Sequence, residues 1–138
     1  LEKLLILNQK VVGLDNFDTG FQYNIDQAIE EARRETGVDL SNNFQFIRGD
    51  IRNLGDCKLA CIGVDYVLHQ AALGSVPRSI ADPINTNRAN IDGFLNMLVA
   101  SKDENVKRLE VGKCQSIDIG KSEKEPKNTY KPFANLNI

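Results

Sequence analysis

The feature that most constrains this chain is a regular alternation between short apolar runs and longer stretches of helical periodicity. Val11, Val12 and Leu14 form a short β-branched run that closes at Asp15, which is typical of a buried strand. One helical stripe contains Leu1, Leu4, Leu5 and Asn8. The sequence therefore predicts the end of a helix followed by a strand.

The same alternation continues along the chain. Apolar residues recur at helical spacing from Ile25 to Ala32, and the stretch ends at Gly37, the residue type that most easily adopts a left-handed C-cap. This pattern predicts a helix over residues 24–36. The remaining pattern predicts strands at 44–47, 64–69 and 106–111 and helices at 53–62 and 84–99.

Strands that alternate with helices pack as a parallel sheet with helices on both faces. We therefore expect an α/β fold, a doubly wound parallel sheet in three layers, built from residues 1–112. Residues 113–138 are rich in Lys, Glu, Pro and Asn and show little periodicity. We expect them to form a degenerate, mobile tail.

Composition argues against several classes of partner. With 17 basic and 19 acidic residues the net charge is −2, so we expect no nucleic-acid partner. No apolar run approaches the roughly 18 residues that span a bilayer, and the N-terminus lacks a signal-peptide pattern. This predicts a cytoplasmic protein with no membrane partner. Three cysteines without paired spacing predict reduced thiols, and we expect no metal site at Cys57 and Cys61.

Polar residues follow the predicted strands, at the edge where ligands gather in an open α/β sheet. Asp15 follows the first strand, where a carboxylate can accept hydrogen bonds from both hydroxyls of an adenosine ribose. The same carboxylate repels a 2′-phosphate, so the position favours NAD over NADP. The alternative is that Asp15 only caps a turn.

The next strand ends are consistent with the same ligand. Asp50 can accept a hydrogen bond from an adenine amino group while Ile51 packs on the ring. The small residues Ala71 and Ala72, which follow Gln70, allow a dinucleotide to approach the backbone closely.

Two neighbouring features are less decisive. The loop at 74–79 carries a hydroxyl and a guanidinium, which suit a sugar and its phosphates, yet an ordinary helix-entry loop has the same composition. His69 lies in a predicted buried strand with no acid or nucleophile placed beside it, so we expect it to be structural.

Three strings are more specific than any single residue. They are Val-Val-Gly-Leu-Asp-Asn-Phe-x-Thr-Gly (11–20), Gly-Asp-Ile-Arg (49–52) and His-Gln-Ala-Ala-Leu-Gly-Ser-Val-Pro-Arg-Ser (69–79). Together they resemble the UDP-N-acetylglucosamine 4-epimerases of bacterial surface-polysaccharide pathways, in the NAD-dependent epimerase/dehydratase (extended short-chain dehydrogenase/reductase) family. The likeness covers roughly residues 1–111. It implies a Rossmann-type domain, a UDP-sugar substrate, and NAD that removes a hydride from C4 and returns it to the opposite face.

The resemblance also implies roles for individual positions. Those for the cofactor are Asp15, Asn16, Thr19 and Gly20 at the adenosine ribose, Asp50 and Ile51 at the adenine, and Gln70, Ala71 and Ala72 along the rest of the dinucleotide. Those for the substrate sugar are Gly74 and Ser75.

The chain departs from the family pattern in three places. The resemblance implies a first strand with a Gly-x-x-Gly-x-x-Gly loop, a serine-rich run after residues 106–111, and a Tyr-x-x-x-Lys pair. The glycine loop is absent, Ser116 is the one candidate for a catalytic serine, and Tyr130 is followed four residues later by Ala134. We therefore expect a partial Rossmann-type domain, a fragment that is inactive alone.

In this fold the missing first strand lies between the strands at 10–14 and 64–69. Either these two strands close up into a four-stranded sheet, or their unpaired backbone groups remain open, which lowers stability or invites association. We favour the second outcome, and it leaves a homodimer among the expected partners.

Two other functions remain open at this point. A catalytically silent nucleotide-binding or interaction module fits the lost tyrosine, lysine and glycine loop equally well. A phosphoacceptor signalling domain is also an α/β fold with acids at strand ends. The spacing of this sequence does not fit a phosphoacceptor domain, because His69 occupies the position at which such a domain needs its acceptor aspartate.

Overall fold

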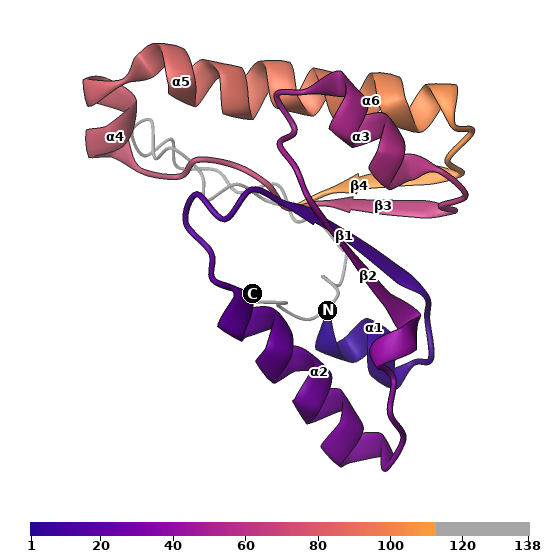
Figure 1. The fold of residues 1–138 in the computed structure, drawn as a ribbon. Helices are drawn as coiled ribbons and strands as arrows, with labels where there is room; N and C mark the ends of the chain where they lie inside the picture. Colours follow the sequence, from indigo (N-terminus) through magenta and orange to yellow (C-terminus); the bar gives the residue numbers. More distant parts are fainter. Residues whose placement is uncertain (113–138) are drawn as a thin grey trace, which may run out of the picture.

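The computed structural model describes residues 1–112 of the chain (Figure 1). Helices and strands alternate along it as the sequence predicts. The elements are α1 (Glu2–Ile6), β1 (Val11–Asp15), α2 (Gln22–Thr36), β2 (Phe44–Arg48), α3 (Leu54–Cys61), β3 (Tyr66–His69), α4 (Val76–Ala81), α5 (Pro83–Asn87), α6 (Gly93–Asp103) and β4 (Arg108–Val111). A 3-10 turn, Ser41–Asn43, precedes β2, and a π-helical turn, Arg88–Asp92, joins α5 to α6.

The strands form two separate parallel pairs. In the first pair β1 lies against β2, with Val11 opposite Phe44 and Asp15 opposite Arg48. In the second pair β3 lies against β4, from Tyr66 to His69. Within residues 1–112 no ladder joins β1 to β3. The middle of the sheet is therefore open, which is the second of the two outcomes considered from the sequence.

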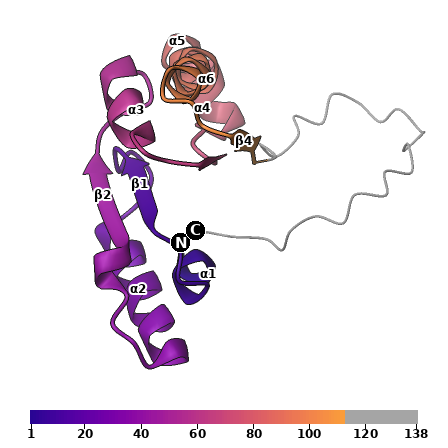
Figure 2. The same ribbon diagram turned by 90° about the vertical axis from the view of Figure 1, so that its right-hand side faces the viewer.

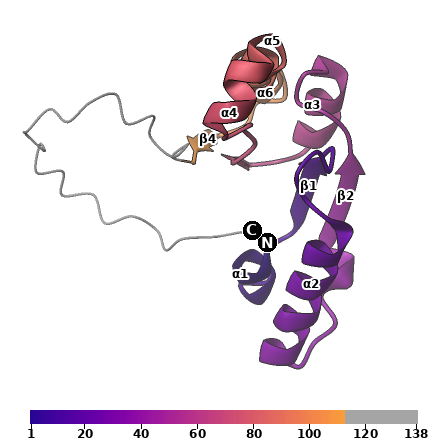
Figure 3. The same cartoon turned by 90° about the vertical axis from the view of Figure 1, so that its left-hand side faces the viewer.

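Helices cover both faces of the first strand pair and one face of the second (Figures 1 and 2). On one side α1 and α2 pack on β1 and β2 around a cluster of buried residues, Leu5, Ala32 and Leu40. On the other side α3 and α6 pack over both strand pairs, around Cys57, Cys61, Val67, Met97 and Ala100. The view from the opposite side shows the same arrangement, with α3 and α6 on one side of the strands and α1 and α2 on the other (Figure 3).

The helix ends follow from local sequence. Gly37 ends α2 in the left-handed conformation, with φ of 71°, because a residue without Cβ adopts this conformation at no steric cost. The helix predicted at 84–99 is a continuous helical path made of α5, the π-turn and α6. Of the helices described here, none has the length and apolar character needed to cross a membrane.

The loop expected at 74–79 is shorter than its predicted range, because residues 76–81 form helix α4 and Ser75 is the N-cap of that helix, in agreement with the helix-entry alternative. The Ser75 side chain caps this helix by accepting a hydrogen bond from the Arg78 amide at 3.4 Å. Pro77 stands in the first turn, where its missing N–H is not needed. These two residues were the available signal, but a six-residue helix has too little apolar periodicity to reveal itself.

A core substitution tests the packing of α1 against α2. Leu5 is fully buried, so L5A should lower the free energy of unfolding by about 2–3 kcal/mol through lost burial and an unfilled cavity. Leu7, close by in the chain, is 67% exposed, and L7A should change it by less than about 0.5 kcal/mol. Urea denaturation followed by circular dichroism measures both. Equal effects would contradict the packing of α1 described here.

Candidate functional site

Two acidic strand ends meet at the carboxyl edge of the first strand pair. Asp15 is the last residue of β1, and Asp50 lies two residues beyond the end of β2. Asn16 links them, because its Nδ2 donates a hydrogen bond to Asp50 Oδ2 at 3.0 Å. The register of parallel strands brings these residues together, as the sequence suggests for neighbouring strand ends.

The turn after β1 fixes the Asp15 carboxylate. The Phe17 amide donates to Asp15 Oδ1 at 2.6 Å, and the Asp18 amide donates to Asn16 Oδ1 at 2.9 Å. Asp15 is exposed, and among the described residues its second oxygen, Oδ2, receives no side-chain or backbone hydrogen bond. Asp15 therefore does cap a turn, as the simpler interpretation requires, yet it keeps an open acceptor toward solvent.

Phe17 occupies the left-handed region, with φ of 60°. This conformation costs a residue with Cβ roughly 1–2 kcal/mol. Its ring stacks on Phe46 with centroids 5.0 Å apart, and the Arg48 guanidinium lies 5.7 Å from the Phe17 centroid. Such aromatic and cation–π contacts contribute about 0.5–1.5 and 0.5–1 kcal/mol respectively. The contacts offset the cost of the backbone conformation.

The acceptor positions of the Asp50 carboxylate are already occupied by hydrogen-bond donors. Arg52 donates its amide at 2.8 Å and its Nε at 2.9 Å to Oδ1, and Nη2 pairs with Oδ2. The Asn16 amide takes a further position on Oδ2. A carboxylate has about four acceptor positions, so none is left open. The Arg52 hydrogen bonds hold the pKa of Asp50 well below its usual range.

Ile51 faces the second helix layer. Its side chain lies so close to Gly93 that a Cβ there would come within 2.6 Å of Ile51 Cδ1. Its carbonyl accepts hydrogen bonds from Asn96 Nδ2 at 2.9 Å and Cys57 Sγ at 3.3 Å. Gly93 therefore has a packing reason to be glycine. The role of Ile51 beside an adenine ring stays a prediction.

The segment after β3 carries the remaining predicted residues. Gln70, Ala71 and Ala72 are exposed, as are Gly74 and Ser75. Asn90 holds this segment at Leu73, accepting from its amide at 2.7 Å and donating to its carbonyl at 3.1 Å.

Asn90 was not among the predicted site residues, although it lies in the stretch that resembles the family. A polar residue within a predicted helix was the only signal available from the sequence. The hydrogen-bond pair with Leu73 gives it a clear structural role.

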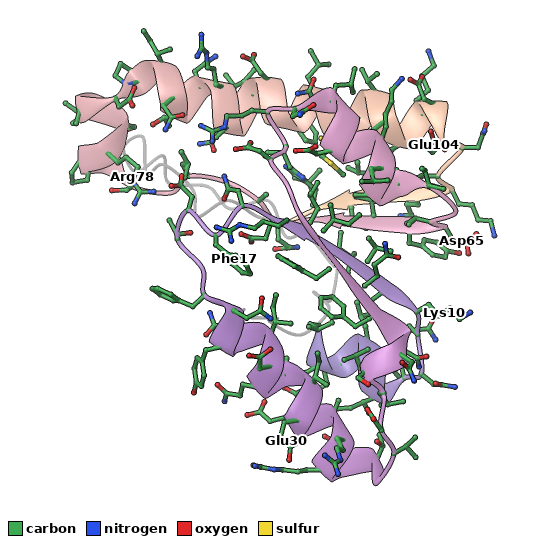
Figure 4. All side chains as sticks on the ribbon, viewed as in Figure 1. Lys10, Phe17, Glu30, Asp65, Arg78 and Glu104 are labelled. Atoms are coloured by element: carbon green, nitrogen blue, oxygen red, sulfur yellow. The ribbon has the colours of Figure 1, made fainter. Side chains whose placement is uncertain are left out.

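Two further predicted positions, Thr19 and Gly20, lie in the loop that leads from Asp15 to α2, and the Phe17 side chain of the same loop is seen in Figure 4. A Cβ on Gly20 would lie 3.8 Å from the Phe17 ring, so this glycine is not sterically required. Ser116 lies outside the described residues.

Neither the histidine nor the buried cysteines are poised for chemistry. His69 is 8% exposed and packs on the Phe94 ring at 5.3 Å, and burial lowers its pKa, which favours the neutral ring. Burial raises the pKa of the Cys57 thiol to about 11, so it stays protonated at neutral pH and is a poor nucleophile. Both residues serve packing, in agreement with the sequence interpretation.

Almost the whole chain matches a known protein family. The family model described as the NAD dependent epimerase/dehydratase family matches residues 1–137. The chain belongs to this family. NAD, the cofactor expected from the sequence, is the cofactor on which the family depends, and the Rossmann-type α/β class is confirmed by the solved structures that share its fold.

Several relatives are sugar-nucleotide epimerases. The bifunctional UDP-glucose 4-epimerase and UDP-xylose 4-epimerase 1 of Pisum sativum is 30% identical over 115 residues, which cover 82% of this chain and 31% of the relative. The UDP-glucose 4-epimerase of Thermus thermophilus, solved with NAD, is 32% identical with a TM-score of 0.61, covering 78% of this chain and 30% of that one.

A third relative concerns a different substrate. The UDP-N-acetylglucosamine 4-epimerase from Methanobrevibacter ruminantium, solved with UDP-N-acetylmuramic acid, is 30% identical with a TM-score of 0.58. It covers 79% of this chain and 33% of that one. The chain thus spans about a third of the length of these relatives.

Replacing Arg52 tests the charge network around Asp50. The pKa of Asp50 is lowered in the folded state, so the pair stabilises the fold above the unfolded pKa, near 4, and this stabilisation is lost as pH falls through the lowered pKa. R52Q should raise the Asp50 pKa toward its usual value. At pH 7 it should lower the unfolding free energy by about 1 kcal/mol, because the Arg52 side chain is 34% exposed and water screens the pair.

Carbon-detected NMR titration of the Asp50 carboxyl and urea denaturation at several pH values measure these changes. Arg33, on the exposed side of α2, is a matched control, and R33Q should leave the Asp50 titration unchanged. An R52Q stability loss that stays constant from pH 7 down to pH 3 would show that the carboxylate pair is not its source.

Proposed function

We propose that this chain supplies the adenosine-binding part of the NAD site of a nucleotide-sugar 4-epimerase. One observation carries the proposal: an exposed carboxylate, Asp15, ends β1 beside a second acid, Asp50, at the edge of a parallel strand pair. A carboxylate with an open acceptor at such an edge, as Asp15 has, suits the ribose hydroxyls of a nucleoside.

Asp15 is the residue best suited to the ribose. Its backbone turn holds Oδ1 in place through the Phe17 amide, while Oδ2 is free to accept from a ribose hydroxyl. A charge-assisted hydrogen bond of this kind is about twice as strong as a neutral one. The same charge opposes a 2′-phosphate, so the site favours NAD over NADP.

The substrate proposed is UDP-N-acetylglucosamine, interconverted with its galacto epimer. The string at 69–79 supports this choice, and so does the UDP-N-acetylglucosamine 4-epimerase from Methanobrevibacter ruminantium among the solved structures that this chain resembles. Gly74 and Ser75 are the residues that we assign to the sugar. Both are exposed at the end of the segment that Asn90 anchors.

NAD, when bound, supplies the hydride acceptor and donor, and a protein base must move the proton of the C4 hydroxyl. The family pair for this step is Tyr-x-x-x-Lys. Here the three tyrosines, Tyr23, Tyr66 and Tyr130, are followed four residues later by Gln27, Gln70 and Ala134. We therefore propose that the chain of 138 residues is a fragment that binds nucleotide without turnover.

A second candidate function is a silent nucleotide-binding or interaction module. The absence of the tyrosine–lysine pair from the sequence favours it. Such a module would share the NAD site of the epimerase proposal and would differ in having no UDP-sugar to convert.

Nucleotide binding is the first test. Isothermal titration calorimetry or ligand-observed NMR should detect NAD binding, and D15N should weaken it roughly tenfold by removing a charged acceptor. Asp65 lies at the opposite end of the strands (Figure 4), so D65N should leave affinity unchanged. D15N should also bring the dissociation constants for NAD and NADP closer together, because the charge that repels the 2′-phosphate is gone. The proposal fails if NAD does not bind, or if D15N and D65N behave alike.

Turnover is the second test. The purified chain with saturating NAD should produce no detectable UDP-N-acetylgalactosamine from UDP-N-acetylglucosamine, because no tyrosine–lysine pair is present to move the proton. Chromatography of the nucleotide sugars, with a full-length epimerase as the positive control, provides the measurement. Detectable conversion would reject both the inactive fragment and the silent module.

A further inference from the structure

The turn after β1 contains a residue whose role goes beyond the proposed function, although the inference rests on that function. We propose that Phe17 is a positioning residue that aims the Asp15 carboxylate at the ribose, held in its left-handed conformation by Phe46 and Arg48 of the neighbouring strand.

The first observation is the backbone conformation itself. A bulky residue with φ of 60° is a true outlier, because its Cβ crowds the following carbonyl. Such residues persist only where surrounding contacts over-determine them, and they cluster at functional sites. Asn8 and Asn105 also have positive φ, but asparagine tolerates this region readily. Phe17 has no such tolerance and needs an external reason.

The second observation supplies that reason. The ring of Phe17 stacks on Phe46 at 24° between planes, and Arg48 lies over the same ring. Both partners belong to β2, and Arg48 is the residue opposite Asp15 in the strand register. The turn is therefore fastened to the adjacent strand and does not rest on local turn geometry alone. The Phe17 side chain lies beside the end of β1 (Figure 4).

The third observation connects the ring to the carboxylate. The amide of Phe17 donates to Asp15 Oδ1 at 2.6 Å, and the contacts of the Phe17 ring with Phe46 and Arg48 hold the residue that carries this amide against β2. Without these ring contacts residue 17 would be free to move away from β2, and the Asp15 carboxylate would lose its fixed donor. The remaining oxygen, Oδ2, would then lose its fixed direction. Phe17 touches no ligand in this account and acts only through Asp15.

The decisive readout is discrimination between two ligands that differ in one hydroxyl. The probes are NAD and its analogue that lacks the adenosine 2′-hydroxyl. The chain should bind NAD roughly tenfold more tightly than the analogue, as expected for one hydrogen bond to a charged group. F17A removes the stack on Phe46 and the contact with Arg48 that hold the turn, so the preference of this variant for NAD over the analogue should fall below about twofold. F17Y keeps the ring and should retain the preference.

A control variant, F21A, and a second test variant, F46L, distinguish the positioning role from a general loss of structure. Phe21 is 71% exposed in the same segment and makes no stack with Phe17 or Phe46, so F21A should keep the preference. F46L removes the aromatic partner from β2 and should lower the preference as F17A does. Because Phe17 acts through Asp15, the double variant F17A/D15N should discriminate no worse than D15N alone. Thermal unfolding by circular dichroism identifies any variant that fails to fold, in which case F46L decides.

The outcomes separate this inference from the proposed function. If the chain does not bind NAD, the proposed function fails and the positioning role fails with it. If the chain binds NAD and prefers it over the analogue, but F17A or a folded F46L keeps that preference, only the positioning role is overturned. Equal loss in F21A would likewise overturn it, since general loosening of the segment would then explain the result.

Discussion

The packing of one apolar core holds the two strand pairs in their relative places. Leu14 of β1 and Val67 of β3 both pack in the cluster under α3 and α6, together with Cys57 and Met97. No backbone ladder joins β1 to β3 within residues 1–112, so directional hydrogen bonds do not fix their spacing. Hydrophobic burial, which stabilises by roughly 25 cal/mol per Å² and has no preferred direction, fixes it instead.

The two strand pairs are buried to different extents. The first helix layer covers only β1 and β2, so the outward side chains of the other pair, Tyr66 at 65% and Leu68 at 46%, remain exposed. The alternate residues Val67 and His69 point toward α3 and α6 and are buried. A doubly wound sheet normally buries both faces of its strands. The second strand pair therefore has the character of a half-covered sheet.

The sequence predicted the helices well where apolar residues repeat over several helical turns, and it predicted the strands from short β-branched or aromatic runs. The bounds of α2 and β2 differ from those predicted by no more than two residues. The apolar stripe of α2 is long, and Gly37 marks the end of that helix. Helix α4 was missed since six residues carry little periodicity. The separation of the strand pairs followed from the missing first strand, an expectation that depended on family resemblance and not on pattern.

The chemistry of the site was less accessible from sequence. Placing Asp15 and Asp50 at neighbouring strand ends needed only the strand order, but their different states depend on side-chain geometry. Arg52 reaches back two residues to fill Asp50, whereas the turn at Phe17 leaves one oxygen of Asp15 open. A ligand group that donates to Asp50 must displace either Arg52 or the Asn16 amide, and the bond from the uncharged Asn16 amide is the weaker of the two. Asp15 needs no such exchange, so it is the carboxylate that can recognise a hydroxyl without rearrangement.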